Sequence, residues 1–279
     1  MVTLSDLTLR QLETLDEYKA CVRLQRETWG QNFLDIVPAT ILMVSQRVGG
    51  VTAGAFDANG RLLGFVFGMS GVRDGELVHW SDMLAVRSEI RGLGLGKRIK
   101  LFQRELLLKQ DIQVAYWTYD PLVSRNANLN LNGLGAVPVE YLVNMYGNTG
   151  GTLHRGLDTD RFIVEWRLTA SHVERALTGK SQSLPPAALE APVVNSDVIT
   201  GESPHVQSPS LPTTDWVRIV VPLDIDQVKV TALDDARLWQ LMTRHAFQWY
   251  LAHGYRVSGF QPVPDAGHAY YFVTNQTEW

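Results

Sequence analysis

A glycine-rich turn, Val86-Arg-Ser-Glu-Ile-Arg-Gly-Leu-Gly-Leu-Gly-Lys97, is the feature that most constrains the fold of this chain. It joins a predicted strand, Leu77–Val86, to a predicted amphipathic helix, Lys97–Gln110. Glycines let the backbone approach an anion closely, and the first turn of a helix presents unpaired N–H groups and the positive end of its dipole. Lys97, Arg98 and Lys100 add positive charge on that turn. The turn therefore predicts a phosphate-binding loop.

Two common nucleotide-binding patterns do not fit this turn. A Walker-type loop needs glycine where Arg91 stands and Ser or Thr where Arg98 stands. A dinucleotide-binding GxGxxG pattern counted from Gly92 needs glycine at Lys97, and it normally follows the first strand of its fold. The pattern (Gln/Arg)-x-x-Gly-x-(Gly/Ala) does fit, starting at Arg91. A glycine-rich turn that binds nothing is the alternative interpretation.

Hydrophobic periodicity predicts a mixed series of strands and helices around the turn. The predicted strands are Thr8–Leu12, Thr52–Asp57, Leu62–Gly71, Leu77–Val86, Val114–Tyr119, Ala136–Tyr146 and Phe162–Leu168. The predicted helices are Leu15–Trp29, Pro38–Val48 and Lys97–Gln110, with a loop and short helix at Pro121–Leu134. Asp57-Ala-Asn-Gly60 is typical of a hairpin turn.

The segment from Arg91 through Gly94 to Gly96 resembles the cofactor signature of the GCN5-related N-acetyltransferases (GNAT). The predicted order of elements over residues 8–168 is also similar to that family's. A second segment, Ser124–Gly135, resembles its second cofactor segment at Asn126, Ala127, Leu134 and Gly135. The resemblance implies an α/β (α+β) fold with a mixed, mostly antiparallel sheet flanked by helices.

The resemblance also implies an N-acyltransferase that uses acetyl-CoA or another acyl-CoA as co-substrate and needs no metal. The backbone of Leu84, Ala85 and Val86 would bind the pantetheine arm and polarise the acyl carbonyl. The loop that would hold the pyrophosphate comprises Arg91, Gly92, Leu93, Gly94, Leu95, Gly96 and Lys97, and Asn126 would also contact the coenzyme. A general base would take the proton of the attacking amine, and a general acid would protonate the leaving thiolate.

The general acid is where the sequence departs from the family. The usual tyrosine position holds Leu131. Tyr119, Tyr141 and Tyr146 are the other candidates, and Tyr146 is favoured because it is expected to end a strand facing the site. Plain packing is the alternative for each, and a thiol of pKa ~8.5 can leave without an acid.

Two residues of the Leu77–Val86 strand are candidates for the base. Strand alternation places Asp82 on one face with Trp80 and Leu84, and His79 on the other with Ser81, unless a bulge swaps the faces. Apolar neighbours would raise the pKa of Asp82, whereas a histidine starts from ~6.5. A structural role is the alternative for both. His245 is expected to lie in the core.

The acceptor is expected to be the amine of a small molecule. Arg125 could bind a carboxylate of the acceptor with two hydrogen bonds. The alternatives are that Arg125 contacts a coenzyme phosphate or that it is simply exposed to solvent. Tyr119 is a second candidate contact, within Trp117-Thr-Tyr-Asp-Pro-Leu122, a segment similar to one in relatives that acylate free amino acids. The acyl group is then acetyl or succinyl. A competing hypothesis is a non-catalytic acyl-CoA-binding or assembly module.

The composition changes after the GNAT-like region. Residues 179–215 contain six prolines, six serines and no Phe, Tyr or Trp, which predicts a linker or an extended segment lying on a neighbour. The expected organisation is a GNAT domain at 1–178, this linker, and a βαββ unit at 216–279. That unit has strands at Trp216–Leu223, Tyr255–Phe260 and His268–Thr274 and a helix at Asp234–His253. We expect this unit to dock on the first domain or on a dimer mate. It would either form one side of the acceptor cleft or only stabilise the fold.

Composition sets the remaining expectations. A net charge of −4 gives no overall attraction to nucleic acid or to anionic membranes. Cys21 is the single cysteine and is expected to be a packed, unreactive thiol. Neither a signal peptide nor a membrane-spanning run is recognisable, so the cytoplasm is the expected compartment.

Overall fold

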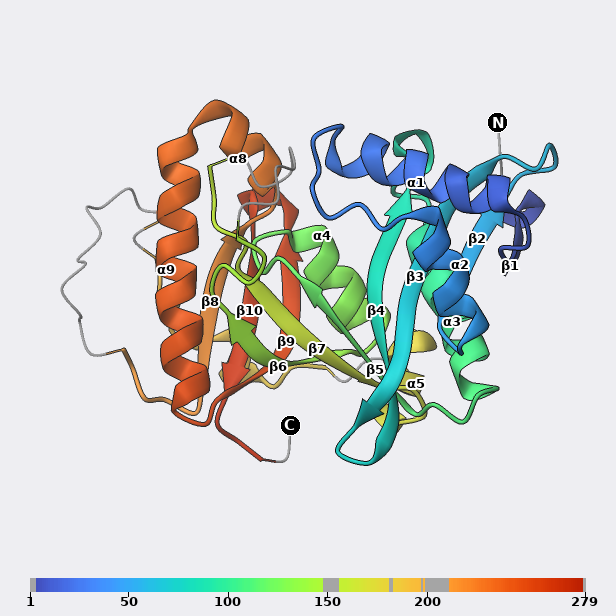
Figure 1. Cartoon of the computed structure of the whole chain (residues 1–279). Helices are drawn as coiled ribbons and strands as arrows, with labels where there is room; N and C mark the ends of the chain where they lie inside the picture. Colours follow the sequence, from blue (N-terminus) through green and yellow to red (C-terminus); the bar gives the residue numbers. More distant parts are fainter. Residues whose placement is uncertain (1–3, 148–155, 181–182, 197, 199–210, 278–279) are drawn as a thin grey trace. The chain divides into compact units, whose positions relative to one another are not determined.

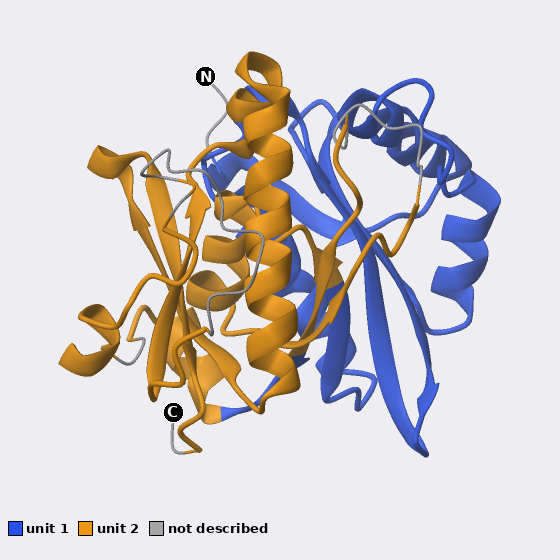
Figure 2. Ribbon diagram, turned by 90° about the vertical axis from the view of Figure 1, so that its left-hand side faces the viewer, with its two compact units in different colours: residues 1–117, 148–153, 166–170 blue, residues 118–147, 154–165, 171–279 orange. Residues whose placement is uncertain are grey.

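The computed structural model describes residues 4–147, 156–180, 183–196, 198 and 211–277. The chain divides into two compact units (Figure 2). Unit 1 comprises residues 1–117, 148–153 and 166–170, and unit 2 comprises residues 118–147, 154–165 and 171–279. These units differ from the sequence-based division at residue 178, because much of the second half of that expected domain belongs to unit 2.

The strands and helices follow the predicted order (Figure 1). The strands are β1 (Thr8–Gln11), β2 (Val51–Phe56), β3 (Leu62–Arg73), β4 (Glu76–Val86), β5 (Val114–Tyr119), β6 (Val137–Leu142), β7 (Arg161–Arg167), β8 (Trp216–Pro222), β9 (Arg256–Val263) and β10 (His268–Thr274). The helices are α1 (Leu15–Trp29), α2 (Ala39–Arg47), α3 (Leu95–Leu108), α4 (Ser124–Ala127), α5 (Ser171–Leu177), α6 (Pro186–Leu189), α8 (Ile225–Thr231) and α9 (Leu233–Ala252). A π-helical turn, η3 (Asn128–Gly133), follows α4, and short 3₁₀ turns lie at Leu4–Asp6, Ser88–Ile90 and Pro264–Ala266.

The strands form a seven-stranded sheet of order β1-β2-β3-β4-β5-β7-β6 and a three-stranded sheet of order β8-β10-β9. In the larger sheet β4 and β5 are parallel, and the pairs β1–β2, β2–β3, β3–β4 and β6–β7 are antiparallel. The expected mixed, mostly antiparallel sheet with flanking helices is therefore confirmed.

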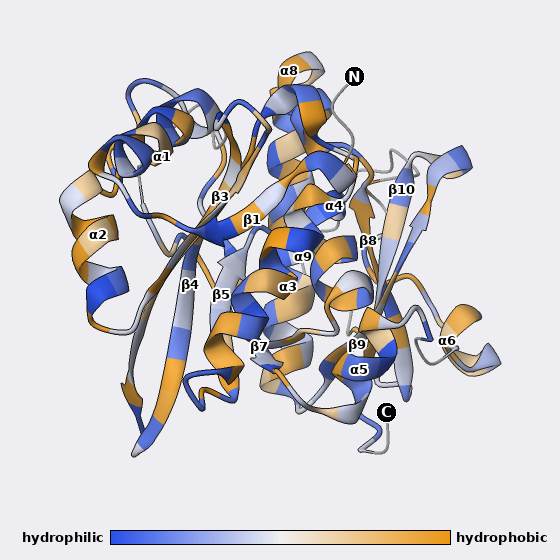
Figure 3. Ribbon diagram, turned by 90° about the vertical axis from the view of Figure 1, so that its right-hand side faces the viewer, coloured by the Kyte–Doolittle hydropathy of each residue, from blue (hydrophilic) through white to orange (hydrophobic). Residues whose placement is uncertain are grey.

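Unit 1 places α1 and α2 on one face of its strands and α3 on the other (Figure 3). Under α1 and α2, a core forms from residues such as Leu24, Leu42, Phe65 and Phe67. Cys21 lies in it fully buried, and burial raises the pKa of its thiol, so the expected packed thiol is confirmed. The helices are amphipathic, and burying their apolar sides against the strands is what stabilises them.

Two hairpin turns connect the strands of unit 1. The predicted turn at residues 57–60 is confirmed, because Gly60 adopts φ 75° and its N–H bonds the carbonyl of Asp57. A second turn, at Asp74 and Gly75, was not predicted. Their φ angles of 53° and 82° allow the tight connection between β3 and β4, so β3 continues past Gly71.

Unit 2 has an aromatic core that joins chain segments far apart in sequence. Phe162 of β7 lies 4.6 Å from Phe247 of α9 and 6.0 Å from Tyr271 of β10, measured between ring centroids. Tyr141 of β6 lies 5.6 Å from Phe247. The predicted C-terminal strands and long helix are present, and α8 is an additional helix between β8 and α9.

The described part of the proline-rich stretch is packed rather than loosely held. Ala188, Ala191 and Asn195 are buried. Val193 bridges Arg218 of β8, and the Arg218 Nε donates to the carbonyl of Ala191. This part therefore fits the extended-segment interpretation, while residues 181–182, 197 and 199–210 lie outside the described residues.

Candidate functional site

A β-bulge interrupts β4 in front of the glycine loop. Phe67 of β3 pairs with Met83, but its neighbour Gly68 pairs with Ser81, so Asp82 has no partner on β3. The bulge swaps the faces of the strand. Ser81 hydrogen-bonds side chains of α3, whereas Met83 belongs to the core under α1 and α2. The expectation that a bulge would swap the faces of this strand is thus confirmed. The simple alternation, which placed Leu84 and Asp82 on the same face, is wrong.

The parallel ladder between β4 and β5 is short. It runs from Val78 opposite Val114 to Trp80 opposite Tyr116, whereas β4 continues to Val86. Residues 84–86 pair with β3 at residues 66–64. Residues 84–86 lie beyond this ladder, so among the described residues their strand pairing is with β3 alone, and the Val86 carbonyl accepts from the Arg91 Nε.

The glycine loop turns sharply into α3, which starts two residues earlier than predicted. Gly92 and Gly94 adopt φ angles of 81° and 89°, and Gly94 is the N-cap of the helix. A Cβ at Gly92 would meet no atom within 4 Å, and one at Gly94 would meet only Leu4 Cδ1, at 4.0 Å. The backbone here is open to a ligand. This turn, placed after the fourth strand, agrees with what the resemblance to the GNAT family implies.

The side chains of the loop lie around this turn without closing it. The Arg91 Nε donates to the carbonyl of Val86 at 2.9 Å, and Arg91 is exposed. Arg98 donates to the carbonyl of Leu4. Leu93 is 53% exposed, whereas Leu95 is buried and anchors the start of α3. Gly96 and Lys97 lie in the first turn of the helix.

Asp82 projects from the bulge as an exposed residue whose surroundings still alter its ionisation. Partial desolvation raises the pKa of its carboxyl above the ordinary value. A hydrogen bond with the Trp80 side chain opposes this shift, and the nearby charge of Asp35 adds to it. The pKa shift has the predicted direction, and a carboxyl shifted upward is better matched to proton transfer near neutrality.

His79 lies in the interior of unit 1, fully buried beneath α3. Its Nε2 lies 3.0 Å from Gln103 Nε2, and its Nδ1 lies 3.0 Å from Ser70 Oγ. Burial, aided by the charge of Lys100, lowers the pKa of His79 to about 3. A neutral imidazole with both nitrogens engaged inside the protein does not reach a substrate, so this structure places His79 away from the role of base.

Lys100 is the unexpected member of this interior. Its charge was expected to add to the positive charge on the first turn of the helix, but only 2% of Lys100 is exposed. Its Nζ donates to Gln103 Oε1 at 2.7 Å and to Ser81 Oγ at 2.9 Å, and lies 3.8 Å from the ring centroid of Trp117. Burial lowers its pKa to about 7. The burial of Lys100 was hard to predict from the sequence, because the apolar stem of a lysine often covers helix surface while its charged end stays in water.

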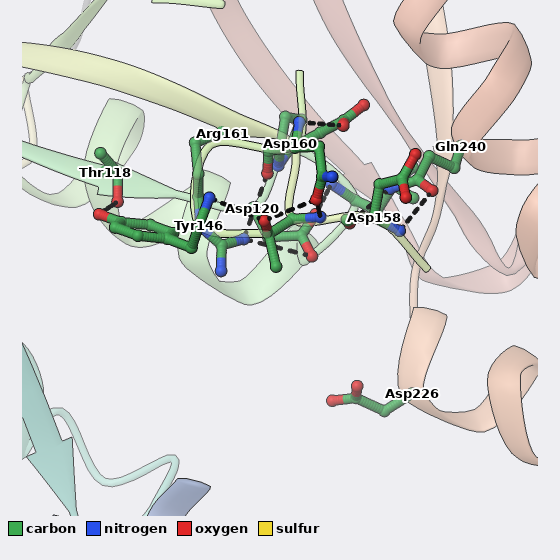
Figure 4. A network of polar contacts seen from close by, with 12 residues as sticks. Thr118, Asp120, Tyr146, Asp158, Asp160, Arg161, Asp226 and Gln240 are labelled. Carbon is green, nitrogen blue, oxygen red and sulfur yellow. Dashed lines mark hydrogen bonds and ion pairs between the residues drawn. The ribbon is translucent and has the colours of Figure 1, made fainter. Parts of the chain in front are cut away.

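Tyr146 was predicted to end a strand, but it lies beyond the end of β6. In unit 2 β6 stops at Leu142, and a turn with Asn144 at φ 47° follows. The Tyr146 hydroxyl lies 2.9 Å from Thr118 Oγ1, and the Arg161 guanidinium lies 5.5 Å from its ring centroid (Figure 4). Its side chain is 41% exposed, so the phenol is accessible.

Tyr119 is placed in a core rather than on a binding surface. Only 4% of it is exposed, and its hydroxyl accepts a hydrogen bond from Tyr271 at 3.3 Å. Burial raises its pKa. Tyr141 is likewise engaged, since its hydroxyl donates to Asp160 at 2.7 Å. Of the three tyrosine candidates, Tyr146 alone is exposed.

Arg125 and Asn126 lie on the short helix α4. The Arg125 side chain is 65% exposed and forms an ion pair of 3.0 Å with Asp226 of α8. It lines a hollow of about 290 Å³ together with Val123, Ser124, Leu223, Asp224 and Ile225. Asn126 is partly exposed beside it. Arg125 thus already pairs with a carboxylate of its own unit.

Unit 2 contains a series of ion pairs that was not predicted from the sequence (Figure 4). Arg244 of α9 pairs with Asp158 and Asp160 at 2.7 and 2.8 Å, and Arg161 lies 3.7 Å from Asp120. Burial raises the pKa of Asp120, and the charge of Arg161 opposes that shift. Residues so distant in sequence give no local signal of such pairing.

The described residues contain no group of three or more His, Cys, Asp or Glu side chains arranged to hold a metal ion. Within the same residues, no helix has the length and apolar character needed to cross a membrane.

No protein-family model and no curated protein matches the chain. Solved structures do match. The NatC complex bound to Gag peptide and CoA and the ribosomal-protein-S18-alanine N-acetyltransferase from Escherichia coli each show 17% identity and a TM-score of 0.46, and cover 59% of this chain and 99% and 96% of their own. An acetyltransferase of the GNAT family from Streptococcus pneumoniae shows 16% identity and a TM-score of 0.46, covering 57% of this chain and 98% of its own. At such values the likeness assigns no activity to this chain.

Proposed function

We propose that the chain is an acyl-CoA-dependent N-acyltransferase that moves an acetyl or succinyl group to the amine of a small molecule such as a free amino acid. One observation carries the proposal. A bulged strand with a partly unpaired edge leads directly into an open glycine turn at the start of a fourteen-residue helix. Amides of residues 92–97 would hold the pyrophosphate of the coenzyme, and the edge of residues 84–86 would hold its pantetheine arm.

The reaction would be a direct attack of the neutral amine on the thioester carbonyl. A backbone N–H of β4 would stabilise the developing oxyanion, because a donor fixed in place needs no reorganisation. Asp82 is the proposed base, since it is exposed next to that edge and its pKa is raised. Tyr146 is the candidate acid because its phenol is accessible.

The weakness of Asp82 as a base favours an acceptor whose amine is easily deprotonated. At pH 7 an α-amine of pKa ~8 costs about 1.4 kcal/mol to deprotonate, whereas a lysine side chain of pKa ~10.4 costs about 4.6 kcal/mol. The proposed acceptor is therefore an α-amine of a small molecule. The alternative of a non-catalytic acyl-CoA-binding module is favoured by Leu131 at the place of the usual acid.

Replacing Gly94 with valine tests the coenzyme site. A β-branched residue at φ 89° is strained, and its side chain would cover the open turn. Binding of acetyl-CoA or succinyl-CoA, measured by calorimetry, is expected to weaken at least tenfold, with the fold unchanged by circular dichroism. Gly60→Val is the matched control, because Gly60 also has a positive φ in an exposed turn and belongs to the 57–60 hairpin.

Equal coenzyme affinity in the Gly94 and Gly60 variants would overturn the assignment of the loop. Thiol release from acetyl-CoA and succinyl-CoA, measured with a library of amines, then separates the two functions. Amine-dependent release supports the enzyme. Tight coenzyme binding without release for any amine would favour the binding module.

A further inference from the structure

A hollow of about 290 Å³ lies in unit 2, where the start of α4 faces the start of α8. One wall consists of Val123, Ser124 and Arg125, and the other of Leu223, Asp224 and Ile225. The volume equals that of roughly ten water molecules at ~30 Å³ each, so a small organic molecule fits in it.

Hydrogen bonds of the chain itself hold the two walls together. Ser124 is only 3% exposed, and its Oγ donates to the carbonyl of Pro222, 98 residues further along the chain, at 2.6 Å. The N–H of Leu223 donates to the carbonyl of Gly267 at 3.0 Å. Since these bonds fix both walls in advance, a ligand need not order them when it binds.

Arg125 lies at the rim of this hollow and is held there by one contact. Its side chain is 65% exposed, and among the described residues its guanidinium makes a single hydrogen bond, from Nη2 to Asp226 Oδ2 at 3.0 Å. Such an exposed ion pair contributes little to stability. Asp226 has a second, shorter ion pair of 2.7 Å with Lys229, whose side chain is only 10% exposed. Arg125 can therefore turn to a ligand while Asp226 keeps Lys229 as its partner.

Asp224 places a negative charge on the opposite wall. Its Oδ1 accepts from the N–H of Gln227 at 3.0 Å, which fixes the carboxylate as the N-cap of α8. Among the described residues, no hydrogen bond reaches its other oxygen, and Asp224 is exposed. Asp224 and Asp226 would repel a ligand that carries only negative charge, such as a phosphate. A ligand with both an ammonium and a carboxylate is complementary to the two walls.

The surface between these charges is apolar. Val123 and Ile225 are 9% and 2% exposed, and Leu223 is half-buried. Apolar groups of a ligand gain free energy when they leave water for such a surface. An α-amino acid with an apolar side chain combines the three features, since it carries a carboxylate, an ammonium and an apolar group on one carbon atom.

We propose that this hollow binds a free α-amino acid with an apolar side chain. Arg125 leaves Asp226 and takes the carboxylate with two hydrogen bonds, Asp224 takes the ammonium, and the apolar residues of both walls contact the side chain. Two sources offer this chemistry, the acceptor of the acyl group and an amino acid that regulates the protein. The binding site stands without the proposed function, whereas its role as the acceptor site rests on that function.

Calorimetry of the full chain with the standard L-amino acids, in the absence of coenzyme, tests the proposal. Apolar amino acids are expected to bind, with L-leucine as the reference probe. L-Leucinamide lacks the carboxylate and 4-methylpentanoate lacks the amine, so each should bind at least tenfold more weakly. Arg125→Met should weaken L-leucine binding at least tenfold. Arg237→Met is the matched control, because Arg237 is 56% exposed, has an ion pair of 3.0 Å with Asp234 and does not line the hollow.

Two further variants separate a direct contact from a structural effect. Asp226→Asn removes the carboxylate that competes for Arg125, so L-leucine should bind a few-fold more tightly. Asp224→Asn keeps an N-cap for α8 and should weaken L-leucine but not 4-methylpentanoate. Equal affinities in the Arg125 and Arg237 variants would overturn the proposal, and so would a wild type that binds none of the standard amino acids.

Activity then distinguishes the two sources. Acylation of the bound amino acid with a KM that Arg125→Met raises identifies the acceptor. Binding without acylation, together with a changed turnover of another amine, identifies a regulator. Because the binding measurements use no coenzyme, a failure of coenzyme A to bind would contradict the proposed function and leave the amino acid site unaffected.

Discussion

At Gly68, the lack of a side chain allows His79 to lie under α3. A Cβ on Gly68 would be 2.2 Å from His79 Nε2 and 2.6 Å from the Trp80 carbonyl oxygen. Neither contact can be relieved cheaply, because the oxygen belongs to the backbone and the imidazole is fixed by Ser70 and Gln103. Gly68 thus stabilises both the bulge and the buried polar series.

Gly68→Ala is therefore expected to lower the free energy of unfolding by about 3 kcal/mol, the upper range for overpacking a core. Gly71→Ala is the control on the same strand, because a Cβ there would meet no atom within 4 Å. That change should be neutral or slightly stabilising, since alanine loses less backbone entropy than glycine. Urea denaturation measures both, and equal stabilities would show that the strand relaxes around His79.

At this scale the sequence predicted backbone features better than side-chain environments. The glycine turn was recognised because positive φ angles at Gly92 and Gly94 require glycine. The positions of Lys100 and His79 were missed, because a charged side chain on an amphipathic helix normally faces water. Lys100 lies against Trp117 and Trp166, which come from two other strands, and His79 lies against Ser70 and Gln103.

Among the elements, β8 has an edge that the proline-rich stretch covers. The Asn195 side chain imitates a strand, since its Nδ2 donates to the carbonyl of Val220 and its Oδ1 accepts from the N–H of Val220, both at 2.8 Å. Only 1% of Asn195 is exposed. Covering an edge in this way prevents it from pairing with another chain.

Asn195→Ala should cost about 2–3 kcal/mol of stability, because two buried backbone groups of Val220 lose their partners together. Asn128→Ala serves as the control, since Asn128 is exposed and accepts its hydrogen bond from Asn132 at the surface. A loss below ~0.5 kcal/mol is expected there. Matching melting temperatures for the two variants would mean that water replaces the Asn195 contacts.

The composition of the proline-rich stretch showed that it has no aromatic residues to anchor it. That composition is compatible with a linker and with an extended segment lying on a neighbour. Contacts with β8 decide between these two interpretations. They are the hydrogen bonds of Asn195 with Val220 and the bridge from Val193 to Arg218, each to a residue more than twenty positions away in sequence. The order of the strands and helices was predictable because each has its own periodicity. The end of β6 was not, since the turn at Asn144 interrupts a run that continues to look like a strand.

At the scale of the molecule, the C-terminal elements complete the core of unit 2. Phe162 and Tyr141 lie against Phe247 of α9, and the buried Asp160 pairs with Arg244 of the same helix. The change in composition at residue 179 had placed these residues in two different expected domains. Compact units follow packing rather than composition, which is why the division at residue 178 differs from them.

A chain that ends at Thr178 is accordingly expected to be insoluble. Removing α9 and β10 exposes the aromatic faces of Phe162 and Tyr141 and leaves Asp160 without its cation, and an unpaired buried charge alone costs about 3–5 kcal/mol. A chain ending at Gln276 keeps β10 and is the control. The measurement is the soluble, monodisperse fraction of each after expression. A soluble 1–178 chain that binds coenzyme A would contradict the prediction, because it would show that residues 118–165 form their core without the C-terminal helix.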